Sequence, residues 1–551
     1  MKSFLKTCLF LTLGFVLLLA AQTTLIPKFR YPRFDEAPED MLEEFYSLPD
    51  KNTVQALFLG SSMSEFHIDP MRIYAQTGIV TFNLGTGNQR MQTSYYLLKE
   101  ALTHAQPKAI FLEVGSMYRW DDWNPQTRYI LDNMRVDQSK VEFSHYYSQR
   151  FPKEKRIGAF LSGLFPIYEY HGRWNELDKN DITVNDTRNL YRKGYFLQAS
   201  VYPSINTLEW INEIADHNHR ADGWIREVSD GTDITTQTKD ILYDPQISEE
   251  NLKLLRSIQQ LCAEKNVELV LFKAPSVTLP VHGPSAWTLL KSQQITQLAG
   301  ELGLQYFDFI YQRDPGIDWS VDTADGGYHM NVLGADKFSS DLAELCKNEL
   351  RLSTAVNRAY EEDMPIYRNV HEAAMVETEQ YLPCYLRRLR ERRQTTVFLA
   401  AYDDMAMNLS TEERQALAEF GLKTNLPALV YSDSYLAILS DGESLYESCG
   451  NRRIEKAGRL KDGTEYSVSS CGFRAGSEAN IIINGRNYSM QRRGINIVVF
   501  DNASGYVLDS VCFDTWAEGE HIAIRDNSNT EKFLREYEQY LMRQDYERGI
   551  R

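Results

Sequence analysis

Between residues 54 and 309 the chain repeats one pattern, a short run of apolar residues followed by a longer amphipathic stretch. The apolar runs predict buried strands at 54–59, 80–84, 109–114, 267–272 and 304–309. Between and after them, apolar residues at helical spacing predict helices over 92–104, 249–265, 286–302 and 333–350. Strands that alternate with helices form a parallel sheet covered on both faces, so we expect an α/β domain.

The block 120–240 interrupts this rhythm. It is rich in Tyr, Trp, Arg and Asn and contains helical pieces such as 157–171. We interpret it as an insertion into the α/β domain. It could lie over the active edge of the sheet as a lid or substrate wall, or be a structural elaboration far from that edge.

A second pattern begins after the charged segment at 357–363. It predicts a helix over 377–392, a strand over 396–401, a helix over 411–420 and then a series of short strands. Turn signals such as Asn484-Gly485 and the stretch 502–505 separate these strands. We therefore expect a smaller, separate α+β domain. The predicted divisions are an anchor at 1–27, a linker at 28–50, the first domain at 51–350, a linker at 351–375 and the second domain at 376–551.

The N-terminal segment has no charged residue from 7 to 26, after Lys2 and Lys6. Twenty uncharged residues match the length that spans a bilayer as a helix. Leu19-Ala20-Ala21 is a weak site for signal peptidase, which favours a retained anchor over a cleaved signal. We expect a single-pass membrane protein whose large acidic body lies outside the cell membrane.

Composition narrows the class of partner. The net charge of −17 argues against nucleic acid, because phosphate binding relies on clustered Lys and Arg. The apolar share of 43% is typical of folded protein.

Among the seven cysteines, Cys262 and Cys346 fall on apolar helical faces and are expected to be packed thiols. Cys449 and Cys471 bracket a polar stretch, and either a bridge or two free thiols is possible there.

Candidate chemistry lies in two short segments far apart in the sequence. Gly60-Ser61-Ser62 follows the first predicted strand, where the carboxyl ends of parallel strands gather reactive groups. Asp325 and His329 lie on a glycine-containing loop near the end of the domain. A serine hydroxyl becomes nucleophilic when a histidine takes its proton and a carboxylate orients the imidazole. The pattern therefore predicts serine-dependent acyl transfer.

These segments resemble the SGNH (GDSL-type) hydrolase superfamily over residues 51–350. The motifs that carry the resemblance are Gly60-Ser61-Ser62, Asn83-Leu84-Gly85 and Asp325…His329-Met330-Asn331-x-x-Gly334. The resemblance implies a three-layer, flavodoxin-like parallel sheet, with Ser62 as nucleophile, His329 as general base and Asp325 as its orienting partner. It also implies oxyanion donors at the backbone N–H groups of Ser62 and Gly85. Ser61 remains the alternative nucleophile.

The sequence departs from the family pattern at two places. The usual acid lies three residues before the histidine, at Gly326 here, so the loop must accommodate one more residue if Asp325 is the acid. Asp322 competes for that role. The family's third oxyanion donor is an Asn after the third strand, where this chain has Val114-Gly115-Ser116, and Ser116 is its only substitute.

The Gly-Ser-Ser segment, the single anchor and the stretch FPIYEYHGRWNEL at 165–177 resemble membrane-anchored SGNH proteins of Gram-positive bacteria. That resemblance implies acyl transfer outside the membrane, beside a membrane-bound O-acyltransferase. No cofactor is expected. No metal site is expected either, because His217-Asn218-His219 has no nearby cysteine or suitably spaced carboxylate.

Two stretches of the second domain resemble the interleukin-like EMT inducer (ILEI/PANDER) domain. They are 395–409, which contains Tyr402-Asp403-Asp404, and 470–516, which ends in Phe513-Asp514-Thr515-Trp516. Their order is swapped relative to the family, as in a circular permutation, which nearby termini make possible. The resemblance implies glycan binding, with Tyr402, Asp403, Asp404 and Trp516 either as ligand contacts or as structural residues.

Together these observations predict an extracytoplasmic serine-dependent acyltransferase or esterase, acting on O-acyl, expected to be O-acetyl, groups of cell-envelope polysaccharide, with a glycan-binding module. The alternative is a non-catalytic glycan-binding or assembly protein that keeps the SGNH fold. The absent third-strand Asn favours the alternative, and the presence of Ser62, Asp325 and His329 opposes it.

Overall fold

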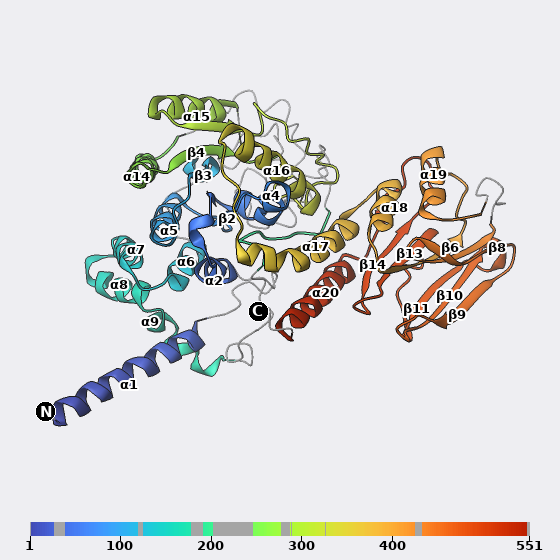
Figure 1. The fold of residues 1–551 in the computed structure, drawn as a ribbon, viewed down its shortest axis with the longest axis horizontal. Coiled ribbons are helices and arrows are strands. Elements are labelled where there is room, and N and C mark those ends of the chain that lie inside the picture. Colours follow the sequence, from blue (N-terminus) through green and yellow to red (C-terminus); the bar gives the residue numbers. More distant parts are fainter. Residues whose placement is uncertain are drawn as a thin grey trace, which may run out of the picture.

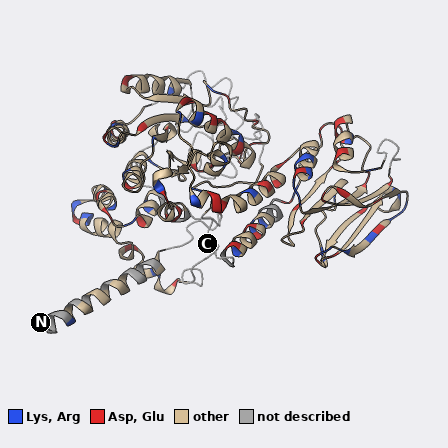
Figure 2. Cartoon of the chain, in the orientation of Figure 1, with Lys and Arg blue, Asp and Glu red and all other residues tan. Residues whose placement is uncertain are grey.

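The computed structural model describes residues 2–26, 39–118, 125–177, 191–201, 246–276, 287, 289–325, 327–424 and 432–547. Two bodies are built around separate sheets, and a helix projects from the first body at the N-terminus (Figure 1). Lys and Arg positions alternate with Asp and Glu positions along the chain of both bodies (Figure 2).

The first body contains a five-stranded parallel sheet in the order β2-β1-β3-β4-β5. Its strands are β1 (Ala56–Leu59), β2 (Thr81–Asn83), β3 (Ala109–Glu113), β4 (Glu268–Lys273) and β5 (Gln305–Asp308). This is the strand order of flavodoxin-like doubly wound sheets. The predicted α/β class and all five strands are confirmed.

Helices cover both faces of this sheet (Figure 1). On one face α4 (Pro70–Thr77) contacts α16 (Val332–Glu344), and on the other α5 (Met91–His104) contacts α14 (Glu249–Lys265). The helix α15 (Leu289–Leu302) precedes β5. Because β1 and β3 are buried on both faces, residues 56–59 and 109–112 are continuous apolar runs and not alternating ones.

Two predicted linkers are in fact helical. The 28–50 linker contains α2 (Glu39–Ser47), whose Met41, Leu42 and Phe45 enter the core. The 351–375 linker contains most of α17 (Arg358–Thr378). The Asn357 side chain caps α17 by accepting from the Ala359 N–H at 3.0 Å. The charged segment at 357–363 was expected to mark a domain boundary. It is instead the start of α17, and one face of this helix is buried.

The described part of the insertion is helical in its first half. It contains α6 (Pro125–Asn133), α7 (Gln138–Ser148), α8 (Arg156–Leu164), α9 (Ile167–Tyr170) and a 3₁₀ turn, η4 (His171–Asn175). A further stretch, 191–201, runs along the first body as irregular chain.

The second body follows α18 (Leu382–Glu391) and contains a mixed sheet. Its central strand β6 (Thr395–Asp403) pairs antiparallel with β7 (Ser434–Ser440) and β13 (Gly494–Asp501), and parallel with the end of β10 (Glu465–Gly472). The remaining strands are β8 (Glu443–Gly450), β9 (Ile454–Arg459), β11 (Glu478–Ile483), β12 (Arg486–Asn487), β14 (Val507–Phe513) and β15 (Ala523–Ile524). The helix α19 (Thr411–Phe420) and both turn signals appear as predicted.

Side chains of β6 alternate between two hydrophobic clusters. Phe398 and Ala400 face a cluster within the second body, whereas Val397 and Leu399 face a cluster that continues through α17 into the first body. The C-terminal helix α20 (Asn527–Glu547) lies beside α17 (Figure 1). The two bodies are therefore joined by packed helices.

The N-terminal helix α1 (Lys2–Leu25) covers the uncharged run of the sequence. Among the residues whose side chains the structure describes, no helix is long and apolar enough to cross a membrane. The membrane-spanning role expected for residues 1–27 therefore stays a prediction.

Candidate active site

Ser62 begins a short helix directly after β1. The chain leaves β1 at Leu59, passes Gly60 and Ser61, and enters α3 (Ser62–Glu65). Gly60 is required at this point because a Cβ there would lie 2.5 Å from the Glu113 Cβ. Because the backbone at Gly60 packs closely against the end of β3, Ser62 lies at the carboxyl end of the sheet. Its side chain is half-buried there.

His329 lies on a tight loop before α16. Thr323 and Met330 form an antiparallel bridge across the base of this loop, and the Ala324 N–H donates to the His329 carbonyl at 2.9 Å. Asp325 Oδ1 accepts from the backbone N–H of His329 at 2.7 Å. The loop thus fixes the carboxylate and the imidazole to one another.

Ser62, His329 and Asp325 form a continuous hydrogen-bonded chain. The Ser62 hydroxyl lies 2.8 Å from His329 Nε2, and His329 Nδ1 lies 2.5 Å from Asp325 Oδ2. With Nδ1–H donating to the carboxylate, Nε2 is left to accept the serine proton. The His329 side chain is 26% exposed and Asp325 41%, so a second reactant can approach the relay from solvent.

The alternative residues occupy other positions. Asp322 is buried and its Oδ2 accepts from the Asp318 N–H at 2.7 Å and from Lys337 Nζ at 2.5 Å. It is therefore engaged away from His329. Ser61 is 1% exposed and precedes α3 as its N-cap residue.

The three expected oxyanion donors differ in their availability. The Ser62 N–H has no hydrogen-bond acceptor among the described residues. The Gly85 N–H donates to Asn83 Oδ1 at 2.9 Å. The Ser116 hydroxyl is buried and lies 3.4 Å from both Met91 Sδ and the Glu113 carbonyl. Of these three donors, the Ser62 N–H is the one without a protein acceptor.

Asn83 also organises the chain beneath the serine. Its amide donates to the carbonyls of Ser64 and Ile68 at 2.7 and 3.0 Å, and its oxygen accepts from the Ser64 hydroxyl. This buried side chain thereby links the end of β2 to α3. Its position two residues before Gly85 is a signal for an Asx turn that the sequence contained.

An aromatic wall borders the imidazole. The Phe66 ring lies 4.6 Å from the His329 ring, and the Phe196 ring lies 4.7 Å from Phe66, measured between centroids. Phe196 belongs to the insertion, and its N–H donates to the Glu65 carbonyl at 2.9 Å. The insertion therefore reaches the site, as the substrate-wall hypothesis requires, through residues that no local motif distinguishes.

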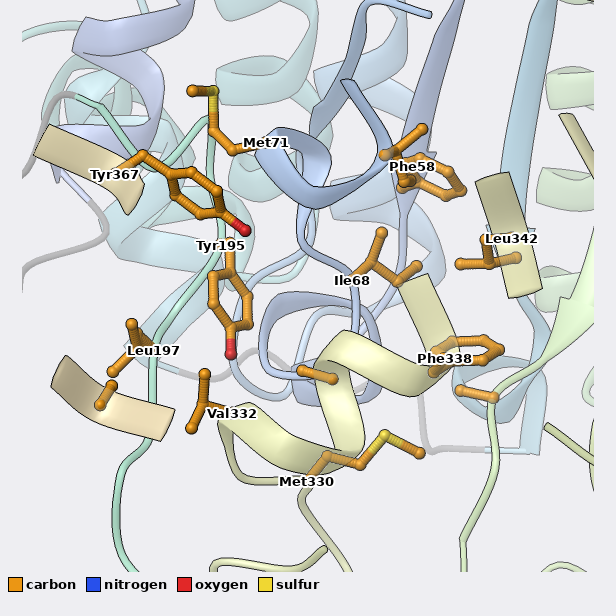
Figure 3. Close-up of a cluster of buried hydrophobic side chains, with 14 of the residues drawn as sticks. Phe58, Ile68, Met71, Tyr195, Leu197, Met330, Val332, Phe338, Leu342 and Tyr367 are labelled. Atoms are coloured by element: carbon orange, nitrogen blue, oxygen red, sulfur yellow. The ribbon is translucent and has the colours of Figure 1, made fainter. Parts of the chain in front are cut away.

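The loop that carries His329 is anchored by buried side chains on both sides. Figure 3 shows Met330 and Val332 within a cluster that includes Ile68 from the first βα connection and Tyr195 and Leu197 from the insertion. The Val332 N–H also donates to the Gln198 carbonyl at 2.7 Å. The insertion thus supports the histidine loop.

His67 lies behind this loop with its ring buried. Its Nε2 accepts from the Met330 N–H at 3.2 Å, which places the ring proton on Nδ1, an atom without a partner among the described residues. Burial, aided by the nearby charges of His329 and Lys273, holds the pKa of His67 well below its ordinary value. His67 is therefore a neutral support for the loop.

A buried ion pair joins the carboxyl ends of β3 and β4. Lys273 Nζ lies 2.8 Å from Glu113 Oε1, and Glu113 Oε2 accepts from the Gly115 N–H at 3.0 Å. This pair fixes the turn after β3, which contains Gly115 and Ser116. The sequence did not predict this pair, because Glu113 and Lys273 are single charged residues at the ends of two different apolar strands.

In the second body, the Tyr402–Asp404 segment is bound into the fold. Asp404 is 3% exposed; its Oδ1 accepts from the N–H groups of Ala406 and Met407, and its Oδ2 from that of Ser432. Asp403 accepts from the Ser477 hydroxyl at 2.6 Å. These contacts give Asp404 a turn-stabilising part.

The other two expected ligand contacts are half-buried. Tyr402 packs against the hydrophobic cluster of the second body. The Arg493 guanidinium lies 5.9 Å above the Trp516 ring.

Cysteines and metal-ligating residues add no further site to the described part of the chain. Cys449 and Cys471 are free thiols. Cys262 and Cys346 are buried as expected, and burial raises the pKa of each thiol to about 12. The described residues contain no cluster of three or more His, Cys, Asp or Glu that could hold a metal ion. The 217–219 segment lies outside those residues.

No protein-family model and no curated protein matches this chain.

Proposed function

We propose that this protein is a serine-dependent O-acyltransferase or esterase of the SGNH type. The observation that carries the proposal is the hydrogen-bonded chain from the Ser62 hydroxyl through His329 to Asp325. This arrangement suits acyl transfer because the serine is the nucleophile, the histidine takes the serine proton, and the carboxylate orients the histidine.

In the proposed reaction the Ser62 oxygen attacks the acyl carbonyl while His329 Nε2 takes the hydroxyl proton. The negative charge that forms on the carbonyl oxygen is stabilised by the Ser62 N–H. His329 then gives its proton to the departing sugar oxygen, which leaves an acyl-serine. A second hydroxyl, from a sugar or from water, gives its proton to His329 and takes the acyl group from Ser62, and His329 returns that proton to the Ser62 oxygen.

We propose O-acyl groups of a cell-envelope polysaccharide as the substrate class. The resemblance to membrane-anchored SGNH proteins supports this choice and suggests a membrane-bound O-acyltransferase as a partner. In this proposal α1 holds the protein in the cell membrane, with the bulk of the chain outside. The second body serves as an ILEI-like module that binds the glycan.

A non-catalytic assembly or glycan-binding role is the second candidate, and one observation favours it. Two of the three expected oxyanion donors, the Gly85 N–H and the Ser116 hydroxyl, already have partners within the protein. Removing one oxyanion donor from a working enzyme costs about 10²–10³ in rate. A slow enzyme and an inactive relative therefore have to be separated by experiment.

The test is a deletion strain complemented with either wild-type protein or Ser62→Ala. We expect deletion to lower the O-acyl content of an envelope polymer, and wild-type protein but not Ser62→Ala to restore it. A raised O-acyl content on deletion would identify an esterase instead. Restoration by Ser62→Ala at equal protein level would support the non-catalytic role and contradict the proposal.

A further inference from the structure

Three large apolar side chains lie exposed on consecutive elements of the insertion. Ile157 on α8 is 76% exposed, Tyr168 on α9 is 55% exposed and Trp174 on η4 is 74% exposed. A Cβ at Gly158 would lie 3.6 Å from the Tyr168 hydroxyl, so α9 folds back over the start of α8. We call Ile157, Tyr168 and Trp174 the α8–η4 surface.

This surface adjoins the N-terminal helix. Both α9 and η4 contact α1, and Arg173 Nη1 donates to the Leu25 carbonyl at 2.6 Å. Figure 1 shows α9 beside the end of α1 that joins the body. Among the α1 side chains that the structure describes, the large apolar ones exposed by more than half are Leu9, Phe10, Leu13, Val16, Leu17 and Leu18. The exposed apolar side chains of the body and of α1 therefore belong to elements that contact one another.

The charges around the α8–η4 surface suit an anionic lipid headgroup layer. Residues 153–176 contain four Lys and Arg residues and three carboxylates, without counting His171, in a chain of net charge −17. Three of the four cations, Lys153, Lys155 and Arg156, directly precede Ile157. One of the carboxylates, Glu169, accepts from the Ser162 hydroxyl at 3.0 Å. The segment thus carries a net charge of +1 within a protein of net charge −17, and its cations cluster beside Ile157.

We propose that the α8–η4 surface lies in the interfacial layer of a lipid bilayer. Trp and Tyr prefer this layer because their rings are apolar and their N–H or O–H groups stay hydrated. Long cationic side chains beside them reach the headgroups. The inference rests on the proposed membrane anchorage of α1 and adds a second contact, which holds the insertion against the membrane surface.

The test uses the full chain in vesicles of phosphatidylcholine and phosphatidylglycerol, with and without a shallow spin-labelled lipid. Single cysteines labelled with the NBD fluorophore replace Ile157, Trp174, Leu13 and Leu445, one at a time. The background carries Cys8→Ser, Cys384→Ser and Cys449→Ser; Cys262, Cys346, Cys471 and Cys512 are buried. Leu445 on β8 is the matched control, because it is 58% exposed on the other body.

We expect the spin-labelled lipid to quench the probes at 157 and 174 at least twofold and to leave the probe at 445 unchanged. Leu13, at the middle of α1, reports on anchorage separately, through a second lipid that carries its spin label near the bilayer centre. Quenching at 13 without quenching at 157 and 174 overturns this inference alone and leaves the surface to water or a protein partner. No quenching at any of these positions overturns the anchorage as well. Equal quenching at 445 also contradicts a specific lipid-facing surface.

Discussion

His67 supports the His329 loop as a buried neutral imidazole, and this makes stability depend on pH. Because the pKa of His67 is depressed in the folded protein, the unfolded chain binds a proton below about pH 6.5 that the folded protein does not. Acidification therefore favours unfolding. His67→Gln keeps an acceptor for the Met330 N–H but cannot titrate.

We predict that wild-type protein loses about 1.4 kcal/mol more unfolding free energy than His67→Gln between pH 7.5 and pH 5.5. Urea denaturation at the two pH values measures this difference. Equal losses in the two proteins would show that His67 takes up its proton in the folded state, contrary to its burial.

At the residue scale, the sequence predicted those site residues that lie in short, recognisable motifs. The strand end at Ser62 and the loop that holds Asp325 and His329 could be located because short motifs encode them. Phe66, His67 and Phe196 could not be assigned to the site, because their roles come from contacts between distant segments. The hydrogen bonds of Asn83 to Gly85 and of Asp404 to Ala406 span two residues, and a search for Asx turns would have found both.

At the scale of elements, one buried lysine joins three segments that the sequence did not connect. Lys193 of the insertion pairs with Glu44 on α2, at 2.8 Å, and with Asp363 on α17. All three lie in regions expected to be linkers or an insertion. Periodicity predicted the five strands of the first body and its helices α5, α14, α15 and α16, whereas α2 and α17 have mixed, charged sequences that gave no comparable pattern.

We predict that Lys193→Met destabilises the protein by about 3–5 kcal/mol, because it leaves two buried carboxylates without their cation. Chemical denaturation at neutral pH measures the change. Lys253→Met, at an exposed position on α14, is the control and should shift stability by less than about 0.5 kcal/mol. Similar effects of the two substitutions would mean that the three segments are not coupled through Lys193.

At the scale of the whole molecule, α17 and α20 join the two bodies. Glu538 on α20 accepts from Arg192 Nη2 at 2.5 Å and from the Tyr191 hydroxyl, both in the insertion of the first body. The second sheet was predicted as a separate module from its strand pattern. Its attachment could not be predicted, because contacts such as those of Glu538 with Arg192 and Tyr191 join residues more than 300 positions apart.

We predict that Glu538→Gln lowers stability by about 3 kcal/mol, since it removes the negative charge that lies 2.5 Å from the buried Arg192 guanidinium. The matched control is Glu536→Gln on the same helix, where the pair with Lys532 is exposed and 3.8 Å long. Thermal unfolding of the full chain should show a clear drop in melting temperature for the first variant alone. Equal melting temperatures would indicate that the two bodies are not held together through this pair.

The central claim, that Ser62 is activated by His329, is tested most directly by covalent labelling of the purified protein with a fluorophosphonate. We predict labelling at Ser62 in the wild type, none in Ser62→Ala, and a fall of roughly 10³-fold or more in His329→Ala. Circular dichroism confirms that each variant is folded. Absence of labelling in folded wild-type protein, or labelling that survives the loss of His329, would contradict the account.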